Sequence, residues 1–195
     1  MIFSKSSNHF WDSCVLIRYL TQNPPELLGD MAKILDEAKV GKRKIWISTI
    51  LFAEFRPNLL STNTRINSIS DLVTEMEGVL IPVAPNMDIT LRAGRMRRHS
   101  FYKPDGERQH NEKKRVLSVP DAIQLATCLF VKEALGINDI EFHTFDDGRG
   151  SNYEEKAVSL LRLADYAKHI DACADIEAVR NLIRIRPQLD NSSFI

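Results

Sequence analysis

Short apolar runs alternate along this chain with longer segments of helical periodicity, and this alternation constrains the fold more than any other feature. Strands separated by helices of ten or more residues are joined by crossover connections, which are right-handed and produce a parallel sheet. We therefore expect a three-layer α/β/α domain with a central parallel sheet of four to five strands. The predicted strands are 9–12, 44–48, 79–83 and 140–145.

The segments between these strands have the i, i+3, i+4, i+7 apolar spacing of amphipathic helices. The predicted helices are 27–38, 50–55, 66–76 and 120–135. After the last strand, 154–169 and 174–186 both have helical periodicity, with no strand pattern between them. We expect one domain over 1–150 and a helical extension over 151–195 packed on the same domain.

The composition excludes several classes of protein. Of 195 residues, 44% are hydrophobic and 27% are charged, which is ordinary for a globular chain and unlike a disordered or collagen-like one. Twenty-six basic residues balance twenty-six acidic ones, so the chain is not basic throughout. Three scattered cysteines form no CxxC pair, and no apolar run approaches the roughly 18 residues of a membrane span. We expect a soluble, cytoplasmic protein without a signal peptide.

Acidic residues follow the predicted strands, at the edge where parallel sheets bind ligands. Asp12 closes the first strand, and Glu54 lies in the helix after the second. Asp121 opens the helix that begins near Pro120, and Asp146 and Asp147 follow the last strand. We expect four such acids to converge from separate parts of the chain.

Each acid also has a structural interpretation. Asp12 could cap the helix that follows it, and Asp121 stands three residues after Ser118 in a capping-box pattern. Asp146 and Asp147 precede Gly148 in a plausible turn. Glu54 is harder to explain this way, because an unpaired carboxylate among apolar neighbours is costly to bury.

A cluster of carboxylates requires cations to neutralise it, since packed carboxylates raise one another's pKa. Oxygen ligands suit Mg²⁺ or Mn²⁺. The five histidines show no HxxxH or similar ligand spacing, and His143 inside the last strand is interpreted as a structural residue.

Four motifs in order resemble the PIN-domain nucleases of the VapC toxin type. Residues 12–17 (DSCVLI) are similar to the family's opening Asp-Thr/Ser-x-Val-Leu-Ile, and 47–54 (ISTILFAE) to its second motif. Residues 117–127 (LSVPDAIQLAT) are close to its most specific segment, in which an acid precedes AxxxAT, and 144–146 (TFD) to its terminal Thr-x-Asp. The resemblance covers about residues 8–148.

The resemblance implies a metal-dependent endoribonuclease that hydrolyses RNA phosphodiester bonds, in the manner of the toxin of a type II toxin–antitoxin pair. Asp12, Glu54, Asp121 and Asp146 would hold one or two Mg²⁺ or Mn²⁺ ions. Ser13 and Thr144 would orient these acids or contact the phosphate. The resemblance further implies an antitoxin protein that covers the site and a homodimer. The chain departs from the family after Asp146, where Asp147 and Gly148 follow, and this leaves the fourth acid open between Asp146 and Asp147.

A basic stretch lies between the third predicted strand, 79–83, and the AxxxAT motif. Residues 92–115 contain nine Lys or Arg residues and three acidic residues. Arg95, Arg97 and Arg98 are among the nine basic residues. It is interpreted either as a solvated helix face and loop or as an arm that tracks phosphates toward the acidic centre. Phe101 and Tyr102 could stack on unpaired bases. We expect Arg95, Arg97 and Arg98 to contact the substrate.

Two other functions remain open on the sequence. A receiver or haloacid-dehalogenase phosphotransfer domain also places Asp at strand ends, but Asp12 lacks the second acid of a DxD pair, and no Lys follows the last strand. A PIN-like fold that only binds RNA or a protein partner is the second alternative.

Overall fold

A five-stranded, all-parallel sheet forms the centre of the computed structural model, which describes residues 6–23, 25–56, 66–102, 115–147, 158–166 and 173–189. Its strands have the order β3-β2-β1-β4-β5. They are β1 (Asn8–Trp11), β2 (Lys44–Ser48), β3 (Leu80–Val83), β4 (Glu141–His143) and β5 (Arg184–Ile185). The predicted α/β class with a parallel sheet is confirmed.

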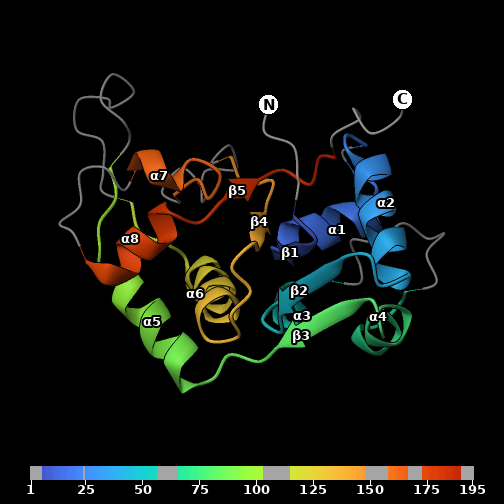
Figure 1. Ribbon diagram of the computed structural model, residues 1–195, viewed down its shortest axis with the longest axis horizontal. Coiled ribbons are helices and arrows are strands. Elements are labelled where there is room, and N and C mark those ends of the chain that lie inside the picture. The colour runs from blue at the N-terminus through green and yellow to red at the C-terminus, as the bar shows by residue number, and fades with distance from the viewer. Residues whose placement is uncertain are drawn as a thin grey trace.

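Helices cover both faces of the sheet, as Figure 1 shows. With α1, α2 and α4 on one side and α5, α6 and α8 on the other, the fold has three layers. The helices are α1 (Ser13–Thr21), α2 (Leu28–Lys39), α3 (Leu51–Glu54), α4 (Ile69–Glu75), α5 (Met87–Arg97), α6 (Val119–Glu133), α7 (Leu163–Tyr166) and α8 (Ala174–Arg180). Within the described residues, none of these helices is long and apolar enough to cross a bilayer.

Side chains alternate between two hydrophobic cores along the central strands, because successive residues of a strand point to opposite faces. Phe10 of β1 and Phe142 of β4 stack with ring centroids 5.4 Å apart in the core shared with α5 and α6. Trp11 belongs to the opposite core, with α1 and α2. His9 shares the face of Trp11, so this face carries polar side chains as well as apolar ones.

The C-terminal part of the sheet differs from the sequence prediction. The helix expected over 174–186 ends at Arg180, and Arg184–Ile185 forms β5 beside β4. The backbone of β4 provides the physical reason, because the N–H groups of Phe142 and Thr144 donate to the carbonyls of Ile183 (2.8 Å) and Ile185 (3.0 Å). These groups would otherwise lie at an open sheet edge.

Two other predicted boundaries are also wrong. The strand expected over 140–145 ends at His143. Of the helix expected over 154–169, the described part is helical only in α7, and the remaining positions fall partly outside the described residues.

The strand order places a ligand-binding edge beside β1. The chain proceeds from β1 through β2 to β3 on one side, and β4 and β5 then lie on the other side of β1. Open α/β sheets bind ligands where the strand order reverses in this way, beyond the carboxyl ends of the strands. In this chain that position is occupied by the residues just after β1 and β4, which are Asp12 and Thr144.

Candidate functional site

Asp12 leaves β1 at this reversal point and is 5% exposed. Its N–H donates to the His143 carbonyl at 3.0 Å, which fixes the start of the loop against β4. Its carboxylate Oδ2 accepts hydrogen bonds from Thr144 Oγ1 at 2.6 Å and from Cys14 Sγ at 3.0 Å. Although Asp12 occupies the N-cap position of α1, its side chain makes no capping hydrogen bond. The carboxylate is therefore held by β4 and not used as a helix cap.

Glu54 ends α3 and faces the beginning of α1. Its Oε2 accepts from Ser13 Oγ at 2.5 Å and from Gln124 Nε2 at 3.1 Å. Gln124 Nε2 also donates to Ser13 Oγ at 2.7 Å. Ser13, Glu54 and Gln124 thus join three helices that follow three different strands.

Sequence reasoning missed Gln124, which is 1% exposed. The sequence could have predicted that Gln124 lies near Asp121. Gln124 follows Asp121 by three residues in α6, and residues three apart share one face of a helix. A polar residue at that spacing, inside an apolar helix, indicates a partner on the face that carries Asp121.

Asp121 lies in the first turn of α6 and is half-buried. The capping hydrogen bond there is made by Ser118, whose Oγ accepts from the Asp121 N–H at 3.1 Å. Ser118 is therefore the N-cap of α6, as the capping-box pattern predicts for that residue.

The electrostatics of the three acids show that they share one environment. Burial is the main cause that raises the pKa of Asp12 to about 7; the hydrogen bonds from Thr144 and Cys14 lower it, and the charges of Asp121 and Glu54 contribute to the rise. Burial also raises the pKa of Glu54. Since a charge perturbs a pKa only at short range, Glu54 and Asp121 lie near Asp12.

Asp146 lies next to this group but is turned toward the C-terminal segment. Its Oδ2 accepts from the Leu160 N–H at 3.2 Å, and its own N–H donates to Thr144 Oγ1 at 3.0 Å. Because β4 ends at His143, the strand alternation that would have placed Thr144 and Asp146 on one face does not extend to them. Asp147 Oδ2 lies 3.5 Å from Arg186 Nη2. Asp146 thus joins the group through Thr144.

The predicted basic arm is partly held by ion pairs within the chain. Arg95 Nε lies 2.6 Å from Asp175 Oδ2 of α8. Arg97 and Arg98 are exposed at the end of α5, and Arg97 Nε donates to the Leu117 carbonyl at 3.2 Å, beside the start of α6. Arg92 is paired with Glu133 and Asp175, whereas Lys103, Arg108, Lys113 and Lys114 lie outside the described residues.

The expectation for Phe101 is wrong. Its side chain is 1% exposed, and its backbone forms a bridge with Arg115, so it packs in the core and cannot stack on bases.

A second cluster joins β1 and β4, and it includes His143, to which sequence reasoning assigned a structural role. His9, Glu141 and His143 are 0%, 6% and 0% exposed. His9 Nδ1 lies 3.1 Å from His143 Nε2, and Glu141 Oε2 lies 3.6 Å from His143 Nε2 and 4.0 Å from His9 Nδ1. This group could hold a metal ion.

Burial lowers the pKa of His9 to about 2 and also lowers that of His143. Both imidazoles are therefore neutral, which is the form that ligates metals. The cluster was recognisable only through strand pairing, because His9 is in register with Glu141, and His143 follows Glu141 by two positions on the same face.

No known protein-family model matches this sequence, and a search of curated proteins finds no match.

Proposed function

We propose that this protein is a metal-dependent endoribonuclease of PIN-like type, as its four motifs suggest. The observation that carries the proposal is the convergence of Asp12, Glu54 and Asp121 at the point where the strand order reverses, with the pKa of Asp12 raised to about 7. Buried carboxylates that oppose one another's ionisation are the arrangement that a divalent cation stabilises. Oxygen donors alone favour Mg²⁺ or Mn²⁺.

The residues around the acids fit such a cation. Thr144 orients the carboxylate of Asp12, while Ser13 and Gln124 orient that of Glu54. These hydrogen bonds leave the other carboxylate oxygens of Asp12 and Glu54 available as ligands, with Asp121 beside them and Asp146 as the fourth acid. A bound Mg²⁺ or Mn²⁺ would supply a water of lowered pKa and neutralise charge on a phosphodiester.

RNA is proposed as the substrate because of the family resemblance and because basic residues flank the acids. Arg97 is held near the start of α6 by the Leu117 carbonyl, and this supports its proposed contact with a phosphate. Arg95 and Arg98 extend the same end of α5. A covering antitoxin and a homodimer belong to the proposal as consequences of the toxin resemblance.

The phosphotransfer alternative fits less well. Receiver domains of the flavodoxin-like type have the strand order 2-1-3-4-5, whereas this sheet has the order 3-2-1-4-5.

Asp12→Asn and Asp121→Asn test the proposal. Each should reduce Mn²⁺-dependent cleavage of single-stranded RNA by at least about a hundredfold, since each removes a charged ligand. Binding of Mn²⁺, measured by calorimetry, should weaken in parallel. Without metal, both variants should melt at the same temperature as the native protein or higher, because repulsion is relieved.

Asp36→Asn is the matched control, because Asp36 is an exposed acid on α2. It should retain full cleavage and Mn²⁺ affinity. Full activity of either Asp12→Asn or Asp121→Asn would contradict the site assignment, and activity that persists in a chelator would contradict the metal requirement.

A further inference from the structure

We propose that His9, Glu141 and His143 form a second metal site, specific for a borderline divalent ion such as Zn²⁺, that ties β1 to β4. His9 and Glu141 lie near the start of β1 and β4, and His143 is the last residue of β4. The inference does not depend on the proposed nuclease activity.

The separations of the three ligand atoms fit the size of such an ion. They form a triangle with sides of 3.1, 3.6 and 4.0 Å. The point equidistant from its corners lies about 2.1 Å from each, which is the bond length of Zn²⁺ to imidazole nitrogen and carboxylate oxygen.

The protons of the cluster indicate why a cation belongs there. Arg43 Nη1 lies 3.0 Å from His9 Nε2 and, as an obligatory donor, requires that nitrogen to accept. A neutral His9 then carries its proton on Nδ1 and donates it to His143 Nε2. Glu141 Oε2 also lies 3.6 Å from His143 Nε2, so His9 and Glu141 both approach the same nitrogen. A cation at the centre would replace these contacts by three ligand bonds.

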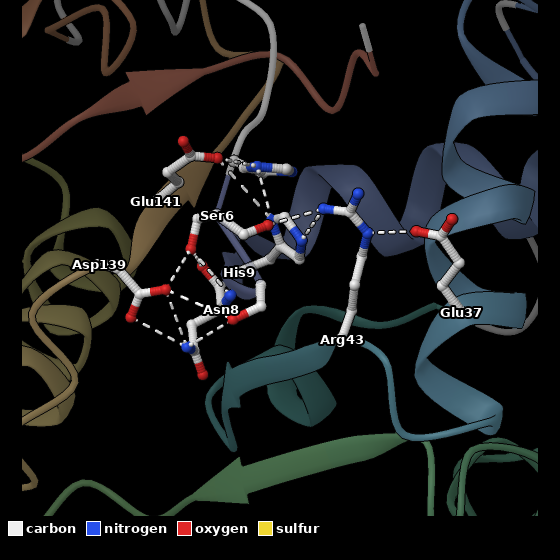
Figure 2. A network of polar contacts seen from close by, with 9 residues as sticks. Ser6, Asn8, His9, Glu37, Arg43, Asp139 and Glu141 are labelled. Atoms are coloured by element: carbon white, nitrogen blue, oxygen red, sulfur yellow. Dashed lines mark hydrogen bonds and ion pairs between the residues drawn. The ribbon is translucent and has the colours of Figure 1, made fainter. Parts of the chain in front are cut away.

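Metal binding would move the His9 proton from Nδ1 to Nε2, toward Arg43. Figure 2 shows His9 between Glu141 and Arg43, with Glu37 beyond the guanidinium. Arg43 Nη1 also donates to the Ser6 carbonyl at 2.7 Å, and its Nε is paired with Glu37. Arg43 can therefore keep these two partners when it loses its contact with His9 Nε2. Arg43 and the metal compete for His9.

The types of ligand distinguish this site from the acidic site around Asp12. Two imidazoles and one carboxylate favour Zn²⁺, Co²⁺ or Ni²⁺ over Mg²⁺, which prefers oxygen ligands and keeps its water. Since His9 pairs in register with Glu141, an ion here would link two strands whose sequence positions are more than 130 residues apart. We assign it a structural role.

Titration of the metal-stripped Asp12→Asn protein with Co²⁺ tests the proposal, because this background weakens the acidic site. One equivalent should bind, with the visible absorption bands of Co²⁺ in a nitrogen- and oxygen-ligated site of low coordination number. Zn²⁺ should displace it and raise the melting temperature. Absence of stoichiometric Co²⁺ and Zn²⁺ binding at micromolar concentration would overturn the proposal.

Three further substitutions in the same background locate the ion. His143→Gln and Glu141→Gln should each weaken Zn²⁺ binding by at least about tenfold, because each removes one ligand. Arg43→Met should leave Zn²⁺ affinity equal or increased, since it removes the competing donor. Unchanged affinity in both ligand variants, or weaker binding in a folded Arg43→Met protein, would show that the ion lies elsewhere and overturn the assignment.

Discussion

At the scale of single residues, Asp12 is the most constrained side chain of the acidic site. It is buried, near two other acids, and accepts hydrogen bonds from Thr144 and Cys14. Burial also raises the pKa of the Cys14 thiol, so Cys14 stays protonated and acts as a donor. The site therefore disfavours the charge on Asp12 in the absence of a cation, and this makes stability depend on pH.

Asp12 should make the metal-free protein less stable as pH rises. Its pKa is about 7 in the folded state and near 3.8 when unfolded, so the folded state binds more protons between these values. The free energy of unfolding should then fall across this window by about 1.4 kcal/mol per pH unit from this group, and level off above it. Urea unfolding of the native and Asp12→Asn proteins in a chelator, from about pH 4 to pH 8, measures the difference.

In Asp12→Asn this contribution should be absent, so the variant should gain stability relative to the native protein as pH rises. Saturating Mn²⁺ should reduce the difference, because it binds the ionised carboxylate. Parallel pH profiles for the two proteins would show that Asp12 ionises normally.

Thr144 should increase the Mn²⁺ affinity of the acidic site by orienting the carboxylate of Asp12. Thr144→Val removes the 2.6 Å hydrogen bond to Asp12 with little change in shape, and we expect Mn²⁺ affinity to fall by roughly tenfold. Thr127→Val is the control, because Thr127 is equally buried but bonds to Ser48 and the Ile123 carbonyl. Calorimetry at one pH compares them, and equal affinities would exclude a positioning role for Thr144.

At the scale of elements, β5 supports the site through β4. The Ile185 carbonyl accepts from the Thr144 N–H, and the Ile185 side chain is 4% exposed. Ile185→Ala should cost roughly 2–5 kcal/mol by leaving a cavity. Ile183→Ala is the matched control, because Ile183 is 49% exposed and should cost within about 0.5 kcal/mol. Equal losses in urea unfolding would show that β5 is not packed against the core.

A comparison of β2 and β5 shows where sequence reasoning succeeds and where it fails. Lys44–Ser48 was predicted with its observed bounds, because five residues between turn signals carry a clear apolar pattern. The segment 181–186 fits a helix and a strand equally well, and only the open edge of β4 decides between them. The local sequence pattern of 181–186 contains no information about this unpaired edge of β4.

The candidate sites differ in the same way. Asp12, Glu54 and Asp121 were predictable, since each stands beside its own strand or helix signal. The cluster of His9, Glu141 and His143 was not, because it depends on which strands pair and in which register. The orientation of Asp146 was likewise missed, as it depends on Leu160 in a segment that carries no motif.

At the scale of the whole molecule, zero formal net charge hides an uneven distribution. If the end of α5 contacts phosphates, replacing Arg95, Arg97 and Arg98 by Gln should weaken RNA binding and reduce its salt dependence. Turnover at saturating RNA should change little, because contacts made equally before and during the reaction affect binding alone.

Replacement of Lys33, Lys39 and Lys42 by Gln provides a control of equal charge change in and just after α2. Fluorescence anisotropy at several salt concentrations compares the two triple variants. An equal salt dependence of RNA affinity in the two triple variants would mean that RNA binding depends only on the total charge of the protein and not on the end of α5.

The long sequence separation between β1 and β4 also has a consequence for the order of events during synthesis. The bond from Thr144 to Asp12 spans 132 residues, and the β5 carbonyl that holds Thr144 comes later still. Contacts so distant in sequence form slowly and only after the intervening chain has been made. A nascent chain would therefore display Asp12 early, yet remain unable to position it until most of the protein had left the ribosome. If the protein cleaves RNA, this topology would delay the activity past the translation of its own message.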